Sequence, residues 1–119
     1  MKRYGLTICL REGDDVEREY RKHHEAVWPE VVRSLHAVGV IGLDIFLHGR
    51  QLFMVLDTVD DFDPERDFAR HVASSAKCAE WETLMKAHQE PPPGAAPGAW
   101  WAQMECVCHL PAPSEGTPT

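Results

Sequence analysis

The chain has 119 residues, with 12 Lys and Arg against 19 Asp and Glu, which gives a formal net charge of −7. This length predicts a single domain, expected over residues 1–111, and the acidic balance argues against binding to nucleic acid or to anionic membranes. The longest apolar stretch, residues 37–43, is far too short to span a bilayer, and no signal peptide is recognisable, so we expect a cytoplasmic protein with free cysteine thiols.

The first half of the chain alternates strand and helix patterns. Residues 3–10 carry apolar side chains at every second position, which predicts a strand. Residues 16–38 repeat apolar side chains at steps of three and four, which predicts a long helix that Pro29 kinks or restarts. Residues 40–47 and 51–58 are rich in β-branched and aromatic side chains, and with the tight turn between them they predict a hairpin.

The second half adds helices and a final strand. A short helix is predicted over 66–72 and a longer one over 73–88, followed by a Pro-rich loop over 90–99. Residues 101–110 predict the last strand, and residues 112–119 a disordered tail. The order β-α-β-β-α-β is the ferredoxin-like pattern of the α+β class. Helices on one side of its sheet leave the other face apolar and uncovered, which favours a homodimer packed sheet on sheet.

Two polar aromatic side chains are candidates for chemistry on the long helix. Tyr20 and His24 are four residues apart, so a regular helix places them on the same face, which is also the apolar one. An imidazole has an unperturbed pKa near neutrality, which suits a general acid or base. The alternative is that both rings pack at a helix edge with their polar tips in water.

The sequence gives little support for a metal site. His23 and His24 are adjacent and point in different directions on a helix, and no two histidines are four residues apart. Cys106 and Cys108 share one face of a strand, yet a structural zinc site needs four ligands. We therefore expect no metal.

One segment carries a family signature. Tyr20, His24 and the run Trp28-Pro29-Glu30 match a pattern of Tyr, three residues, His, three residues and Trp-Pro-Glu. In this the chain resembles the L-rhamnose mutarotase family, and further blocks agree in order, so that the resemblance covers residues 3–111. It implies a cytoplasmic, dimeric α+β barrel that interconverts the α- and β-anomers of a 6-deoxy-L-hexose, a monosaccharide, without a cofactor or metal.

The resemblance also assigns site residues. The catalytic His of the family falls on His24, its pocket Tyr on Tyr20, and its sugar-stacking Trp on Trp81. Two substrate-binding positions depart from the rhamnose enzymes, because Leu43 stands where they have a second pocket Tyr and Glu82 stands where they have a second Trp. These changes make L-fucose, or another deoxy or neutral sugar, a competitor of L-rhamnose. Glu82 is a candidate hydroxyl acceptor or second proton-transfer group, or else a solvent-facing helix residue.

The expected mechanism is acid–base ring opening. His24 would donate a proton to the ring oxygen, and Tyr20 would orient His24 or bind a sugar hydroxyl. Trp100 or Trp101 could supply the missing second indole from the Pro-rich loop. Two other functions occur on similar barrels and stay open at this point: a non-catalytic module for ligand binding or dimerisation, and a cofactor-independent monooxygenase.

Overall fold

The computed structural model describes residues 1–96 and 100–113. Its elements, in chain order, are β1 (Lys2–Leu10), α1 (Val16–Glu25), α2 (Pro29–Ala37), β2 (Val40–His48), β3 (Gln51–Thr58), α3 (Pro64–Ala73), α4 (Ala76–His88), β4 (Gln89–Glu90) and β5 (Ala102–Met104). Residues 97–99 of the expected loop and 114–119 of the expected tail lie outside the described part of the chain. No helix within that part has the length and apolar character needed to cross a membrane.

The strands form one antiparallel sheet with the order β2-β3-β1-β4, and β5 also pairs with β1. This order confirms the predicted ferredoxin-like α+β fold. β4 pairs with Cys9 and Leu10, and β5 pairs with residues 5–7, both along the edge of β1 that β3 does not use. The two short strands therefore take the place of one fourth strand, which the Pro-rich segment interrupts.

The last strand is shorter than predicted. The pattern over 101–110 indicated ten residues of strand, but β5 ends at Met104, and residues 105–113 contain no helix or strand. A strand exists only where a neighbouring chain accepts its hydrogen bonds, and the register that pairs Met104 with Gly5 stops there. The alternating side chains of 105–110 therefore indicated a strand for which the chain itself supplies no partner within the described residues.

The long helix divides at Pro29. Helix α1 ends at Glu25, and α2 begins with Pro29 at its first position, where a missing N–H costs nothing. Trp28 has an extended ψ of 135°, as expected for a residue that precedes proline. The restart confirms one of the two outcomes that the sequence predicted.

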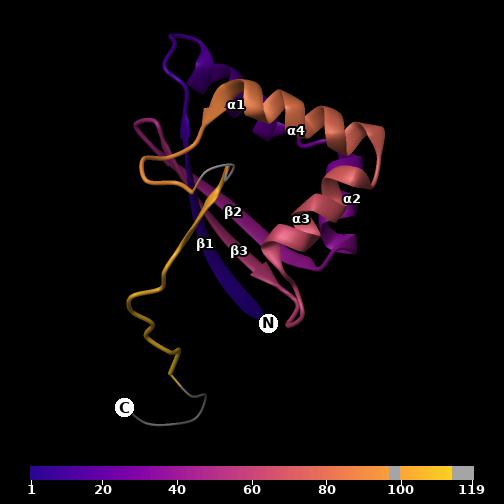
Figure 1. Cartoon of the computed structure of the whole chain (residues 1–119), viewed down its shortest axis with the longest axis vertical. Coiled ribbons are helices and arrows are strands. Elements are labelled where there is room, and N and C mark those ends of the chain that lie inside the picture. The colour runs from indigo at the N-terminus through magenta and orange to yellow at the C-terminus, as the bar shows by residue number, and fades with distance from the viewer. Residues whose placement is uncertain (97–99, 114–119) are drawn as a thin grey trace.

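The helices lie together on one side of the sheet (Figure 1). On that side Ile8 and Leu10 of β1 and Leu52 of β3 are buried in a core cluster that also contains Tyr20 and Trp81. A second cluster, centred on Leu6, Val40, Met54, Leu56 and Phe62, fills the other part of the interface between helices and sheet. The face of the sheet turned away from the helices carries exposed aromatic side chains, among them Phe46 and Phe53.

Candidate active site

Tyr20 and His24 lie one turn apart on α1, and their rings stack. The ring centroids are 4.2 Å apart with an interplanar angle of 29°. Tyr20 is only 4% exposed and belongs to the core, while His24 is half-buried. The four-residue spacing therefore produces the common face that the sequence predicted, and the phenol is buried rather than solvated.

The protonation of His24 follows from its contacts. Nδ1 lies 2.9 Å from the main-chain oxygen of Tyr20. A carbonyl oxygen only accepts hydrogen bonds, so in the neutral ring Nδ1 carries the proton and Nε2 keeps a free lone pair. Burial lowers the pKa of His24 more strongly than this hydrogen bond raises it. His24 is consequently a neutral base at pH 7, with Nε2 available as the acceptor.

The phenol of Tyr20 is held by Gln89, the first residue of β4. Its oxygen lies 3.5 Å from Nε2 of Gln89, which donates to it. Oε1 of Gln89 in turn accepts from the indole Nε1 of Trp100 at 3.1 Å. Burial raises the pKa of Tyr20 to about 12, so the hydroxyl is protonated at physiological pH. Trp100 and Trp101 both pack against the core cluster that contains Tyr20, and Trp100 is hydrogen-bonded to Gln89 there.

Trp81 of α4 is the third aromatic residue of this cluster. This helix begins after Ser75, whose hydroxyl accepts from the backbone N–H of Cys78 at 3.1 Å and so caps the first turn. One turn later Trp81 is 8% exposed and meets His24 edge-on, with centroids 5.5 Å apart. Trp28 also packs edge-on against Trp81, with ring centroids 5.1 Å apart. The structure therefore brings together the three residues Tyr20, His24 and Trp81.

The two remaining candidates lie in different surroundings. Glu82 is half-buried, and its Oε1 lies 3.4 Å from Nζ of Lys86. That ammonium also lies over the ring of Trp100, 5.4 Å from its centroid. Leu43 of β2 stands opposite Leu56 and packs against the second core cluster rather than the one that contains Tyr20. Glu82 is thus connected to the aromatic residues around Tyr20 through Lys86, while Leu43 lies with the other cluster.

Sequence reasoning missed Gln89 and Lys86. Gln89 is buried although it directly follows a helix, a position at which a polar side chain is usually exposed. Its role depends on a contact with Trp100, which returns only after the Pro-rich segment, so no local pattern could have indicated it. Lys86 follows Glu82 by four residues, and this spacing predicts an ion pair but not the contact with an indole.

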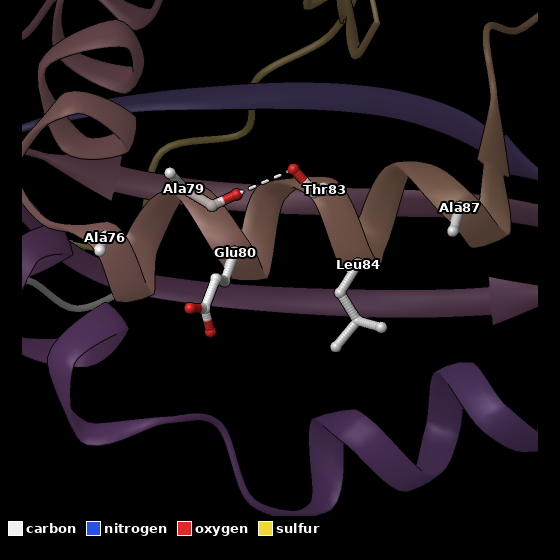
Figure 2. A pocket seen from close by; sticks show the side chains of 6 residues that line it. All are labelled: Ala76, Ala79, Glu80, Thr83, Leu84 and Ala87. Carbon is white, nitrogen blue, oxygen red and sulfur yellow. Dashed lines mark hydrogen bonds between the residues drawn. The ribbon is translucent and has the colours of Figure 1, made fainter.

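A hollow lies along α4. Figure 2 shows it with its lining residues, which are Ala76, Ala79, Glu80, Thr83, Leu84 and Ala87. Its polar groups are few, and the Thr83 hydroxyl is already bonded to the carbonyl of Ala79 at 3.1 Å. None of the sequence-predicted site residues lines it. Among the described residues, no three His, Cys, Asp or Glu side chains gather in a way that could hold a metal ion.

Comparisons with known proteins agree on one family. The family model described as L-rhamnose mutarotase matches residues 3–110. A UPF0734 protein of Dictyostelium discoideum is 35% identical over 112 residues, which is 92% of this chain and 90% of that protein. The L-fucose mutarotase of Xanthomonas campestris is 35% identical over 105 residues, covering 87% of this chain and 83% of its own length.

A solved structure shares the fold. The crystal structure of an L-rhamnose mutarotase from Formosa agariphila superposes with a TM-score of 0.67 at 19% sequence identity, covering 93% of this chain and all of the other. At this low identity the likeness concerns the fold. It places the aromatic cluster of Tyr20, His24 and Trp81 on a scaffold that is used elsewhere for a sugar isomerase.

Proposed function

Because this chain belongs to the L-rhamnose mutarotase family, we propose that it interconverts the α- and β-anomers of a 6-deoxy-L-hexose. Its relatives indicate an isomerase-type enzyme that acts on a monosaccharide. The observation that carries the proposal is the pairing of a neutral imidazole with a protonated phenol, His24 and Tyr20, in contact with the buried indole of Trp81.

The reaction needs two proton transfers. Mutarotation opens the hemiacetal ring, allows rotation about C1–C2, and closes the ring again. During opening the anomeric hydroxyl loses a proton and the ring oxygen gains one. We assign the first transfer to His24, whose Nε2 lone pair accepts the anomeric proton, and the second to Tyr20, whose hydroxyl donates to the ring oxygen. Closure on either face returns both protons, so neither residue is consumed.

This assignment reverses the direction of transfer that the sequence suggested for His24. A histidine whose pKa is lowered by burial is a weaker proton donor at neutral pH, because most of it is uncharged. The same burial disfavours a Tyr20 phenolate. Since both charges form together on rings 4.2 Å apart, the imidazolium and the phenolate attract one another and offset part of that cost.

Substrate recognition is proposed for the residues around this pair. Trp81 offers an aromatic face to the apolar side of the sugar, and Glu82 offers a carboxylate to its hydroxyls. We propose L-fucose as the better substrate and L-rhamnose as the weaker one. Support comes from the L-fucose mutarotase among the relatives and from Leu43, which lacks the phenol expected of rhamnose enzymes. Leu43 packs in the second core cluster, which is joined to the cluster of Tyr20 through Ile45 and Trp101.

We also propose that the active form is a homodimer, a dimeric α+β barrel with the two sheets face to face. On the sheet face away from the helices, Phe46 is 59% exposed and Phe53 is 37% exposed, and their rings stack 6.4 Å apart. Val107 and Leu110 are almost fully exposed in the segment after β5. A second copy would cover both surfaces. The proposed location is the cytoplasm, in keeping with four cysteines that are all free.

The test is anomer exchange measured by saturation-transfer NMR. Wild-type protein is mixed with L-fucose, L-rhamnose or D-glucose, and saturation of one anomeric proton is followed at the other. We expect transfer with the two deoxy sugars and a decrease of about 10²-fold or more in His24→Gln. His36→Gln is the matched control, because His36 is an exposed residue of α2 whose Nδ1 likewise meets a main-chain oxygen, that of Val40 at 3.0 Å. Binding of an L-sugar without exchange would instead identify a ligand-binding module, and full activity in His24→Gln would remove His24 from the mechanism.

A further inference from the structure

Gln89 is a buried amide that joins two parts of the chain. Its side chain is 2% exposed and lies between the phenol of Tyr20 and the indole of Trp100. Its main chain is fixed on both sides. The N–H bonds to the carbonyl of Lys86 at the end of α4, and the carbonyl accepts from Nε of Arg11 at 2.7 Å. The amide is therefore held in place independently of any sugar.

Trp100 determines which way the amide faces. An indole N–H can only donate, so the atom that it meets 3.1 Å away must be the amide oxygen of Gln89. The amide nitrogen then faces Tyr20, and because that nitrogen can only donate, the phenol oxygen accepts from it at 3.5 Å. The phenol has one proton of its own, and this proton is consequently directed away from Gln89.

Trp100 itself is held from the opposite side. The ammonium of Lys86 lies 5.4 Å from the centre of its ring, and Lys86 is paired with Glu82 at 3.4 Å. These contacts keep the indole where its N–H reaches Gln89. The direction in which the Tyr20 hydroxyl proton points thus depends on Trp100, eighty positions further along the sequence.

We propose that Gln89, fixed by Trp100, is a positioning residue that keeps the Tyr20 hydroxyl proton turned toward the sugar. This rests on the proposed function, because it requires Tyr20 to be the donor to the ring oxygen. With the amide reversed, its oxygen would face the phenol and accept that proton, and the ring oxygen would lose its donor. Gln89 acts through Tyr20 and does not touch the reacting atoms.

A double-mutant cycle tests the proposal. Gln89→Met removes both hydrogen-bonding atoms while keeping the length of the side chain. We expect kcat for anomer exchange to fall about tenfold with KM unchanged, the value of one hydrogen bond in the transition state. In a Tyr20→Phe background, the residual exchange that His24 supports should not change when Gln89→Met is added. An equal loss in both backgrounds would mean that Gln89 only maintains the structure, and would overturn the proposal.

Trp100→Phe provides an independent variant if Gln89→Met folds poorly. It keeps an aromatic ring under Lys86 and removes only the indole N–H, so we expect a smaller loss of kcat that again disappears in the Tyr20→Phe background. Gln103→Met is the matched control, since Gln103 is exposed on β5. Wild-type exchange with unchanged Gln89 and Trp100 variants would refute this inference alone, whereas no exchange by wild-type protein with any sugar would refute the proposed function.

Discussion

His24 is bound twice to Tyr20, through its ring face at 4.2 Å and through Nδ1 to the Tyr20 main-chain oxygen at 2.9 Å. The second contact fixes the tautomer, and the first keeps the two side chains parallel. Both partners belong to α1 and are four residues apart, so the helix itself sets their spacing. Small movements of the domain would therefore leave the proposed acid–base pair intact.

The first prediction concerns pH. A base must be neutral to act, and burial lowers the pKa of His24 below its ordinary value of about 6.5. We expect kcat/KM for anomer exchange, corrected for the uncatalysed rate, to be constant from neutral to weakly alkaline pH. It should decrease as the pH falls through the lowered pKa, with a midpoint below about 6.5. A rate that increases on acidification would show that the imidazolium is the active form.

The second prediction separates sugar stacking from packing. Trp81→Phe keeps an aromatic ring but reduces its face, and we expect KM to rise about fivefold with little change in kcat. Trp28→Phe is the matched control, because Trp28 contributes an indole that packs against the same cluster and against Trp81. Both variants should lose similar thermal stability, measured by circular dichroism. Equal effects of the two on KM would contradict a role of Trp81 in binding the sugar.

The third prediction concerns the choice of sugar. Leu43→Tyr restores a phenol at the position where the resemblance implies one in the rhamnose enzymes. We expect the ratio of kcat/KM for L-rhamnose to that for L-fucose to increase about tenfold, the effect of one added hydrogen bond. Leu43→Phe adds the ring without the hydroxyl and should leave the ratio unchanged. If both substitutions shift the ratio alike, side-chain volume rather than hydrogen bonding decides the preference.

The fourth prediction tests the dimer. Phe46→Asp puts a charge on the exposed apolar sheet face, where a partner sheet would have to bury it. We expect wild-type protein to sediment as a dimer and Phe46→Asp as a folded monomer. Val32→Asp makes the same change at an exposed apolar residue of α2 and should remain dimeric. A monomeric wild type, or a dimeric Phe46→Asp, would show that this face is not the interface.

Local patterns predicted most of the fold. The alternation in 3–10, the hairpin and the restart at Pro29 are determined by neighbouring residues, and each is present in the structure. The last strand was predicted too long, because the length of a strand depends on its partner strand and not only on its own side chains. The split of the fourth strand into β4 and β5 could likewise not be predicted, because the two residues of β4 are too few to show an alternating pattern.

The candidate site also has features that local sequence predicts and features that depend on the folded chain. The spacing of Tyr20 and His24 was enough to predict their common face, and the resemblance alone indicated Trp81. The neutral state of His24 could not be predicted, because it depends on how deeply the ring is buried and on the carbonyl that it meets. The contact between Gln89 and Trp100 joins residues on either side of the Pro-rich segment, and only the folded chain brings them together.

The interruption of the fourth strand has a consequence for engineering. β4 and β5 are anchored on the same edge of β1, one just beyond the other, so the chain leaves and rejoins the scaffold at neighbouring points. The length of the intervening insert can change without altering the register of the sheet. Gln89 and Trp100 stand at the two ends of this insert, so the insert could be redesigned while the contacts of both residues and the proposed acid–base pair of α1 are kept.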